Sequence, residues 1–382
     1  MVWSAMSEAD NLLMVADSEH DANMLYAVGM FLPDPFIYFR VDGKCHIVVS
    51  DQELDRARRK ARHCRVISYS QCVERLKREG VKKPTVAAVV HLVLSERETK
   101  KILVPPNFPH GLAKDLRQHK IKVRVKKGSL FPQRELKGLD EVRKISGALT
   151  MAEVGLAEGI QALKNSKIGN DGKLTYHGAP LTSEKLRGII DTAILQAGGQ
   201  PSHTVVAGGK QACELHEQGH GPLRAHEPII IDVFPRSQKT GYYGDIARTV
   251  VRGRASEAVR KLYDTVERAQ QLVFAKLLAD IPAAEVHKEA LDFFDKQGYK
   301  TGRKNGHMQG FFHGLGHGLG MDVHEAPRVN VNSSDVLEAG HVVTVEPGLY
   351  YPEIGGVRLE DVASITPTGA RNLTKFEKSL EV

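Results

Sequence analysis

The sequence predicts an α/β protein of two domains, on three observations. The chain has 382 residues, which is long for one domain and suits two. Over residues 1–127, strand-like and helix-like segments alternate, as in an α/β domain with a mixed sheet. Over residues 138–382, two helices followed by a pair of strands occur twice. We therefore expect a smaller N-terminal domain at 1–127, a linker at 128–137 and a C-terminal domain at 138–382 with pseudo-duplicated halves.

The N-terminal elements follow from local signals. Asp42-Gly43 separates two runs rich in strand formers, which is a strong hairpin signal. The expected order is a hairpin at 36–51, a helix at 52–62, a strand at 65–68, a helix at 73–79, strands at 85–92 and 102–104, a helix at 110–118 and a strand at 120–126. Because no catalytic residue types cluster here, we expect a scaffold, an oligomerisation domain or a substrate gate.

The C-terminal elements begin after the linker, which contains Gly128 and Pro132. Apolar residues from Val142 to Leu163 recur at helical spacing and predict one long helix. The expected helices are 139–164, 183–196, 256–278 and 284–297, and the expected strands are 226–234, 242–251, 341–346 and 356–365.

The formal net charge is +7, and within the region 114–144 the seven basic residues from Lys120 to Lys137 have few acids between them. Such a stretch could form a nucleic-acid face. A solvated strand and linker are favoured instead, because no aromatic residues are interleaved for base stacking. We expect no nucleic-acid partner.

Cysteine usage and the N-terminus indicate a cytoplasmic protein. The four cysteines form no C-x-x-C pair, which fits buried thiols in a reducing compartment. The first residues include acids such as Glu8 and lack the basic start of a signal peptide. The longest apolar run, at 86–94, is too short to span a bilayer, so we expect no membrane partner.

The stretch FFHGLGHGLGMDVHEAP, at 311–327, is the first candidate for chemistry. It places His313, His317 and His324 close together among four glycines, which disfavour a helix. In an extended backbone, residues four apart project to one side. The first two imidazoles are therefore expected to face one cleft.

Four carboxylates interrupt apolar strands in matching pairs. Asp232 is followed by Asp245 thirteen residues later, and Glu346 by Glu360 fourteen residues later. A buried acid is costly unless it is paired or metal-bound. Any single one of these acids could instead face solvent or form an ion pair with Arg248 or Arg358.

Together, four carboxylates and one imidazole suit two divalent ions in an oxygen-rich site. We expect manganese, with cobalt and zinc as alternatives. Water shared by two such ions becomes a nucleophile near neutral pH, so hydrolysis is the expected chemistry.

The run HEQGH, from His216 to His220, also matches the zinc-protease signature H-E-x-x-H. That motif requires a helix, whereas Gly219, Gly221 and Pro222 occupy its continuation. We therefore place His216 beside a substrate pocket instead.

Several spaced motifs resemble the pita-bread metallopeptidases, which include Xaa-Pro aminopeptidases (aminopeptidase P), Xaa-Pro dipeptidases (prolidases) and methionine aminopeptidases. The resemblance covers about 137–374 and implies a pita-bread catalytic domain; residues 1–127 resemble the creatinase-like domain of two-domain members. The matching motifs are Asp232, GYYGDIART around Asp245, HGLGHGLGMDVHE around His317, VEPGLYY around Glu346 and GGVRLED around Glu360.

The resemblance implies that Asp245 and Glu360 bridge two ions, that Asp232 binds one ion, and that His317 and Glu346 bind the other. Glu346 is also implied as the general base toward the bridging water.

Further roles are implied around these ligands. His313 and His324 would lie beside the scissile carbonyl, one orienting substrate and one stabilising the intermediate or shuttling protons. His216 would border the pocket, and Tyr350 and Arg358 would position substrate.

The sequence departs from the family pattern near the first ligands. Val233 and Phe234 follow Asp232 where a glycine is common, and Ala247 replaces a threonine before Arg248. The step from Asp232 to Asp245 is two residues longer than usual, which keeps both aspartates on one face and lengthens the turn 235–241.

The expected function is hydrolysis of the Xaa-Pro bond at the N-terminus of dipeptides or short peptides by a metal-bridging hydroxide. We expect a homodimer, with a partner's N-terminal domain as a candidate to close the cleft. Alternatives are a methionine-aminopeptidase-like enzyme, a creatinase-like hydrolase that works without metals, and a non-catalytic binding module on the same fold.

Overall fold

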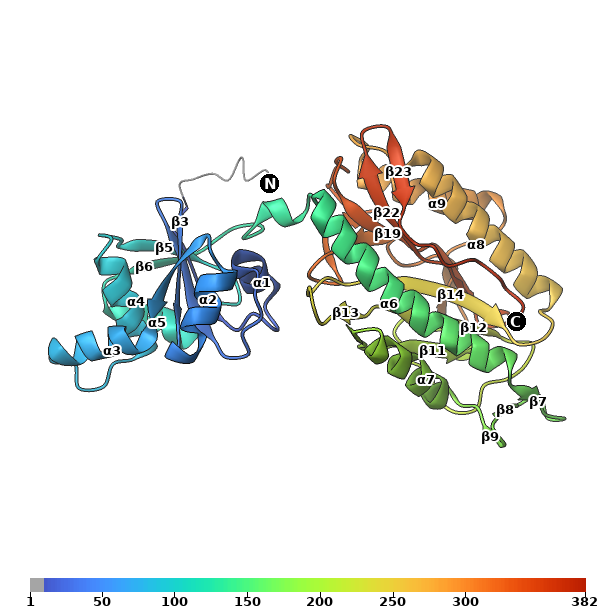
Figure 1. Cartoon of the computed structure of the whole chain (residues 1–382). Coiled ribbons are helices and arrows are strands. Elements are labelled where there is room, and N and C mark those ends of the chain that lie inside the picture. The colour runs from blue at the N-terminus through green and yellow to red at the C-terminus, as the bar shows by residue number, and fades with distance from the viewer. Residues whose placement is uncertain (1–9) are drawn as a thin grey trace. The chain divides into compact units, whose positions relative to one another are not determined.

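The protein, seen here in a computed structural model that describes residues 10–382, separates into two compact units (Figure 1). The first ends at Arg134, and the second runs from Glu135 to Val382. Glu8, one of the acids that argue against a signal peptide, lies outside the described residues. Within residues 10–382, no helix is long and apolar enough to cross a membrane.

The first unit is a single mixed sheet with helices packed against it. Its strands are β1 (Leu12–Ala16), β2 (Phe36–Val41), β3 (Lys44–Val49), β4 (Cys64–Ser68), β5 (Lys101–Val104) and β6 (Lys122–Val125). Its α-helices are α1 (Ala22–Val28), α2 (Leu54–Lys60), α3 (Tyr69–Arg78), α4 (Val86–Ser95) and α5 (His110–Gln118). Short 3-10 turns lie at Asp51–Glu53 and Pro132–Arg134.

The strand order of this sheet is β4-β3-β2-β1-β5-β6. The pairs β1–β2 and β2–β3 are antiparallel, and the other neighbours are parallel. Alternate strand residues enter separate apolar cores, as Leu12 and Leu13 do, so both faces are covered. The predicted α/β domain with a mixed sheet is therefore observed.

One expected strand is a helix. Residues 85–92 were predicted to be extended, but Val86–Ser95 forms α4, which is buried on nearly every side. A short, continuously apolar run has no periodicity that separates a buried strand from a buried helix. The missed signal is Thr85, whose hydroxyl accepts a hydrogen bond from the Ala88 N–H and caps the helix.

The second unit contains four long helices. They are α6 (Leu139–Lys164), α7 (Ser183–Gln196), α8 (Glu257–Lys276) and α9 (Ala283–Lys296), all close to their predicted bounds. α6 and α7 pack against one another and on the strands of one half, and α8 and α9 do the same in the other half (Figure 1). The predicted repetition of two helices and strands is confirmed.

The strands of the second unit form a central three-stranded sheet, a five-stranded sheet and smaller sheets of two or three short strands. The three-stranded sheet has the order β11-β12-β14, with β11 (Val205–Gly208), β12 (Pro228–Val233) and β14 (Ile246–Val251). The five-stranded sheet has the order β18-β17-β19-β22-β23, with β17 (Gly316–Gly318), β18 (Glu325–Val329), β19 (Val342–Val345), β22 (Asp361–Thr366) and β23 (Gly369–Asn372). The small elements are β7 (Lys167–Ile168), β8 (Leu174–Tyr176), β9 (Ala179–Pro180), β10 (Gly199–Gln200), η3 (Gly209–Cys213), β13 (Arg236–Ser237), β15 (Gly302–Lys304), β16 (His307–Gln309), β20 (Gly348–Tyr351) and β21 (Gly355–Arg358).

The strand predicted at 356–365 is two strands. β21 pairs with β20, whereas β22 pairs with β19 in another sheet. The chain crosses between the sheets at residues 359–360, which leaves Glu360 at the junction.

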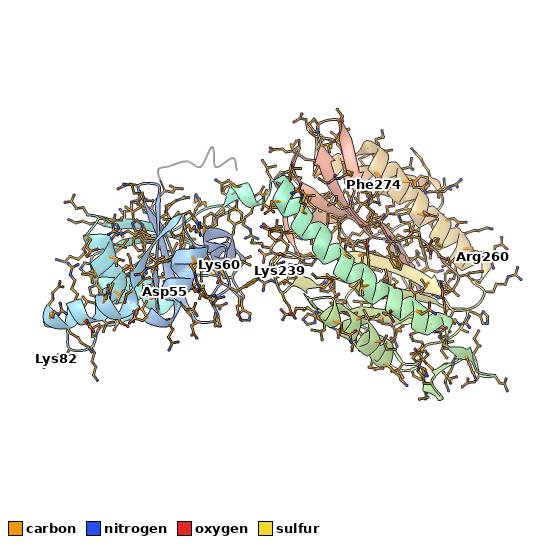
Figure 2. All side chains as sticks on the ribbon, viewed as in Figure 1. Asp55, Lys60, Lys82, Lys239, Arg260 and Phe274 are labelled. Carbon is orange, nitrogen blue, oxygen red and sulfur yellow. The ribbon has the colours of Figure 1, made fainter. Side chains whose placement is uncertain are left out.

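Long charged side chains project from the surfaces of both units, as Lys82 and Arg260 show (Figure 2). Each half of the second unit has its own apolar core beneath this surface. Among the described residues, the acids that are buried instead, Asp245, Glu360 and Asp361, all lie in the second unit.

Candidate metal centre

Four carboxylates come together because each lies in or beside a strand of the second unit. Asp232 lies in β12, opposite Ala247 of β14, and Asp245 directly precedes β14. Glu346 directly follows β19, and Glu360 directly precedes β22. Three of the four acids therefore occupy strand ends, where the expectation was the middle of a strand.

Glycines allow the histidine stretch to approach this point. β17 pairs with both β18 and β19. A Cβ added at Gly316 would lie 2.0 Å from the Thr344 carbonyl oxygen, and one added at Gly318 would lie 2.1 Å from the Ala326 carbonyl oxygen. Only glycine fits such close backbone approach. The strand consequently presents His317 between its neighbours.

The closest cluster joins both halves of the unit. Ligand atoms of Asp245, His317 and Glu360 all lie within 4.8 Å of one another, and all three residues are buried. The His317 Nε2 atom is 3.4 Å from Glu346 Oε1 and 3.8 Å from Asp245 Oδ2. At these distances the side chains can bind a cation placed between them.

The orientation of His317 leaves one ring nitrogen for a metal. Its Nδ1 lies 3.1 Å from the Gly318 carbonyl oxygen, to which it donates a hydrogen bond. That bond fixes the tautomer with a lone pair on Nε2, the atom that faces the carboxylates. Burial also lowers the pKa of His317 to about 3, so the imidazole is neutral, as a metal ligand must be.

The carboxylates repel one another in a desolvated site. Burial, followed by the neighbouring acids, raises the pKa of both Asp245 and Glu360 well above their usual range. Burial also raises the pKa of Glu346 to about 7. A divalent cation would remove this penalty, so the donor set fits a metal site.

Asp232 is held by an arginine. Its Oδ2 accepts a hydrogen bond from Arg358 Nη2 at 2.7 Å. Pairing with Arg358 is one of the alternatives that the sequence allows for each acid. The Asp232 Oδ1 is buried and has no hydrogen-bond partner within residues 10–382. A buried carboxylate oxygen without a donor is destabilising, and a bound cation would satisfy it.

A hydrogen-bonded row continues from Arg358 through Tyr350 to His313. The Tyr350 hydroxyl accepts from Arg358 Nη1 at 3.1 Å and lies 3.0 Å from His313 Nε2. The other nitrogen, His313 Nδ1, lies 2.7 Å from the Gly314 carbonyl oxygen. Burial lowers the pKa of His313 to about 3, so the ring is neutral and fixed at both nitrogens.

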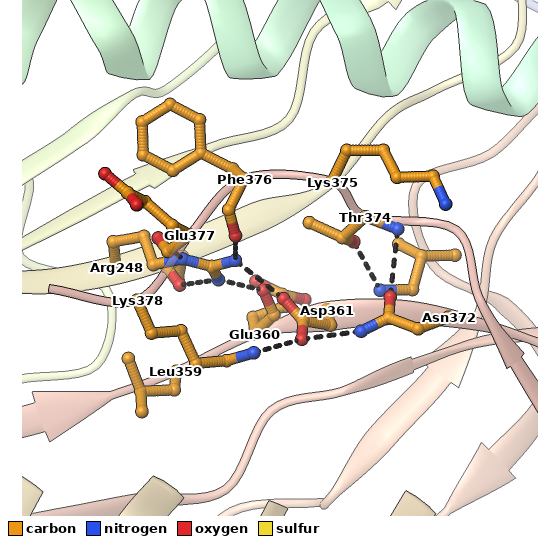
Figure 3. A network of polar contacts seen from close by, with 12 residues as sticks. Arg248, Leu359, Glu360, Asp361, Asn372, Thr374, Lys375, Phe376, Glu377 and Lys378 are labelled. Atoms are coloured by element: carbon orange, nitrogen blue, oxygen red, sulfur yellow. Dashed lines mark hydrogen bonds and ion pairs between the residues drawn. The ribbon is translucent and has the colours of Figure 1, made fainter.

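A second ion pair anchors the backbone beside Glu360 (Figure 3). Arg248 Nη2 lies 2.8 Å from Asp361 Oδ1, and both side chains are almost fully buried. Arg248 Nη1 donates to the Glu360 carbonyl oxygen at 2.7 Å, and Nη2 donates to the Phe376 carbonyl oxygen, also at 2.7 Å. Arg248 thus pairs with Asp361 and not with any of the four clustered acids.

A cavity of about 470 Å³ contains the cluster and all the predicted site residues except Tyr350, which lies behind its wall. His324 is exposed, and its ring meets the His317 ring edge-on with centroids 4.4 Å apart. His216 also lines the cavity. The segment 216–220 is not helical, so it lacks the geometry of a zinc-protease motif.

Thr344 is a site residue that sequence reasoning missed. Its hydroxyl accepts a hydrogen bond from the His317 backbone N–H at 3.1 Å and donates to Glu346 Oε1 at 3.3 Å. The available signal was its position two residues before Glu346, which puts both side chains on one face of an extended chain. The apolar cavity walls, which include Leu215 and Val323, had no comparable signal.

Comparisons with known proteins agree with this arrangement. The chain is 33% identical over 254 residues, 62% of its length, to the uncharacterized peptidase YqhT of Bacillus subtilis, of which it covers 69%. It is 29% identical over 286 residues to an Xaa-Pro dipeptidase of Pyrococcus horikoshii, with 74% of this chain and 75% of that protein covered.

A solved structure of an X-Pro aminopeptidase from Thermotoga maritima superposes with a TM-score of 0.82 over 98% of both chains, at 20% identity. This likeness confirms the predicted fold class. The model of Metallopeptidase family M24 matches residues 143–367, which include every clustered carboxylate and histidine described above. This chain therefore belongs to metallopeptidase family M24.

Proposed function

We propose that this protein is a dinuclear manganese peptidase that hydrolyses the Xaa-Pro bond at the N-terminus of dipeptides or short peptides. The observation that carries the proposal is the convergence of Asp245, His317 and Glu360 in the cavity of a chain that belongs to family M24. The relatives named Xaa-Pro dipeptidase support the choice of substrate.

The proposed ligands are the four carboxylates and one histidine. Asp245 and Glu360, which are both buried, would contribute to holding both ions, as the family resemblance implies. Asp232 would help to hold one ion through its unpartnered Oδ1, and His317 and Glu346 would hold the other. Two bound divalent ions lower the pKa of a shared water and polarise a carbonyl group.

The protein's own groups then handle protons and position substrate. Glu346, whose Oε1 lies 3.4 Å from His317 Nε2, is assigned as the carboxylate that accepts and returns a proton. His324 is exposed, and neither of its ring nitrogens has a hydrogen-bond partner within residues 10–382, so it is available to a substrate carbonyl. His313 is held at both nitrogens and therefore has the orienting role.

The shape of the cavity supports an Xaa-Pro substrate. The proline amide has no N–H and its ring restricts φ, so the peptide must be recognised by shape more than by backbone hydrogen bonds. Val205, Leu215, Phe234 and Val323 line the cavity beside the polar cluster. Such apolar walls can pack against a pyrrolidine ring. His216 borders the same cavity, and Tyr350 and Arg358 stabilise one side of it.

The remaining assignments belong to the same proposal. We assign residues 1–127, of which 1–9 lie outside the described residues, to a creatinase-like domain and residues 128–137 to the linker. The solved structure that covers 98% of this chain supports an N-terminal domain of that kind. A cytoplasmic location is consistent with four cysteines that are all free thiols. The proposed homodimer is testable by light scattering of the purified protein.

The test is an assay of four substrates with added manganese, together with elemental analysis of the protein. Hydrolysis of Ala-Pro or of an Xaa-Pro-Xaa tripeptide is expected. Turnover of Met-Ala-Ser alone would indicate a methionine-aminopeptidase-like enzyme, and turnover of creatine would indicate a creatinase-like one. A protein that binds no metal and turns over none of these would be a binding module.

The variant Glu360→Ala should lose bound metal and lower kcat/KM by about 100-fold or more, as when one group of an electrostatic site is removed. The matched control is Glu353→Ala, since Glu353 is 72% exposed and pairs with Lys304 at the surface. Undiminished activity of Glu360→Ala would remove this residue from the site.

A further inference from the structure

Two cysteines of the first unit lie side by side, apart from the metal centre. Cys45 of β3 and Cys64 of β4 are direct partners in a parallel ladder. Neighbouring strands lie about 4.8 Å apart, and disulfides join Cα atoms about 4.4–6.8 Å apart. Because paired residues project to the same face, these two sulfur atoms are positioned to bond. β4 is an edge strand, so it can adjust as the bond forms.

The surroundings of the pair favour reaction at Cys45. The Tyr38 hydroxyl lies 3.3 Å from Cys45 Sγ. Arg40 of β2 is the partner of Cys45 on its other side, so a cationic residue, Cys45 and Cys64 form one row across the sheet. Cys45 is partly exposed, whereas Cys64 is only 8% exposed. A small oxidant can therefore reach Cys45 first.

The two thiols also differ in acidity. A hydrogen bond from the Cys64 thiol, followed by one from Tyr38, lowers the pKa of Cys45 to about 6. The same contact with Cys45, together with burial, raises the pKa of Cys64. Burial raises the pKa of the other two cysteines, Cys72 and Cys213. At neutral pH the pair thus combines a thiolate with a protonated neighbour, the arrangement of a nucleophilic thiol and a resolving thiol.

We propose that Cys45 and Cys64 form a hydroperoxide-reactive dithiol that closes reversibly to a disulfide within one chain. The proposal depends on the β3–β4 register and on the access of Cys45. It does not depend on the peptidase assignment, since both cysteines lie in the first unit.

The reaction has two balanced steps. The Cys45 thiolate attacks the O–O bond of the hydroperoxide, forming an S–O bond and releasing water, or an alcohol, after protonation. The Cys64 sulfur then attacks Cys45 Sγ, an S–S bond forms, the S–O bond breaks, and the Cys64 proton leaves with the oxygen as a second water. Two thiols are oxidised by two electrons, and the hydroperoxide is reduced. A dithiol reductant returns the disulfide to two thiols and is itself oxidised to a disulfide.

The experiment uses the reduced full-length protein with hydrogen peroxide as the probe. After the reaction, free thiols are alkylated in denaturant, and the disulfide and alkylated peptides are identified by mass spectrometry. We expect a loss of two hydrogens, a Cys45–Cys64 cross-link, and alkylated Cys72 and Cys213. At pH 7, Cys45 should react about 10-fold faster than Cys72 or Cys213, because its thiolate fraction is much larger.

Matched variants separate the two roles. In Cys64→Ser, Cys45 should stop at the sulfenic acid and be labelled by dimedone. In Cys45→Ser, Cys64 should remain a thiol at the same peroxide dose. Cys72→Ser is the control and should still form the cross-link. If a variant does not fold, the mass-spectrometric peptide map of the wild-type protein decides the proposal. Alkylation of Cys45 and Cys64 to the same extent as Cys72, or a cross-link from Cys45 to any other cysteine, would overturn it.

Discussion

The His317 imidazole shows how a single hydrogen bond selects a ligand atom. Its Nδ1 bonds to the Gly318 carbonyl oxygen, so Nε2 faces Glu346 and Asp245 as an acceptor. Neighbouring His313 differs, because Tyr350 and Gly314 occupy both of its nitrogens. His324 is exposed to the cavity. Three histidines from one stretch are thus given three different states by their individual contacts.

This difference predicts the behaviour of His324→Ala. Loss of a general acid or base typically lowers the rate by about 100-fold to 10,000-fold, so kcat should fall by about that much. Metal content should be almost unchanged, because His324 lies outside the closest cluster. Turnover and elemental analysis on the same preparation test this, with the exposed His307→Ala as control. A parallel loss of metal would make His324 a ligand.

The buried acids predict a pH-dependent stability of the metal-free protein. Burial raises the folded pKa of Glu346 to about 7, and raises those of Asp245 and Glu360 well above the usual range. The folded state therefore holds protons that the unfolded state has released, and stability falls as pH rises through these folded pKa values. The histidines with lowered pKa values act in the opposite sense, but only below their unfolded pKa of about 6.5.

Between pH 6.5 and 8.5 the buried acids determine whether the stability of the second unit rises or falls with pH. In EDTA, the Tm for unfolding of the second unit, which is the transition that manganese should shift, should fall as the pH rises over this interval. Each carboxyl contributes up to about 1.4 kcal/mol per unit by which its pKa is raised. Manganese should remove the fall, because it replaces the protons. A metal-free Tm that stays level or rises from pH 6.5 to 8.5 would contradict the buried-acid account.

At the scale of elements, β17 is the strand whose packing sets the site. It lies between β18 and β19 and has glycine at both ends, Gly316 and Gly318, where neighbouring carbonyl oxygens come close. The junction between β21 and β22 has a matching role for Glu360, since Arg248 holds the backbone there. Strands and their ends, rather than loops, therefore position the proposed ligands.

Gly316→Ala tests this packing. The new methyl group would lie 2.0 Å from the Thr344 carbonyl oxygen, so the strands must move apart. Overpacking of this kind costs about 3 kcal/mol, and we expect that loss in the free energy of unfolding together with weaker metal retention. Urea denaturation and metal analysis measure both.

Gly147→Ala provides the control for that variant. Gly147 lies in α6, and an added Cβ would meet nothing within 4 Å. This change should stabilise the protein by up to about 1 kcal/mol, since alanine favours a helix over glycine. Equal effects of the two variants would show that the β17 packing is not limiting.

At the scale of the whole molecule, the chain consists of two units with separate cores. Each unit buries its own apolar side chains, and the clustered acids and histidines all belong to the second. The proposed metal centre and the proposed dithiol are consequently in different units. Their effects on stability can be measured independently.

Calorimetry of the full chain should therefore resolve two transitions. Manganese should raise the Tm of the second unit, because a ligand stabilises only the cooperative unit that binds it. The Tm of the first unit should stay within error of its metal-free value. Magnesium at the same ionic strength is the control for a general salt effect. One single transition that shifts as a whole would show that the units unfold cooperatively.

Several helices and the candidate site residues could be predicted from the sequence alone. Helical periodicity located α6 and α7 within a residue, and the spaced acids and histidines indicated which side chains to examine. It failed at α4, where a run buried on almost every side has no periodicity, and at 356–365, where two sheets share one extended segment.

Local sequence determined the four long helices of the second unit, the two-unit organisation and the chemical types available for a metal centre, because periodicity, turn residues and charge are local properties. Only the tertiary structure decided that Asp245, His317 and Glu360 come within 4.8 Å, that Arg358 pairs with Asp232, and that Cys45 lies beside Cys64. Those distances depend on how strands far apart in the chain pair and cross, and no local pattern specifies that pairing.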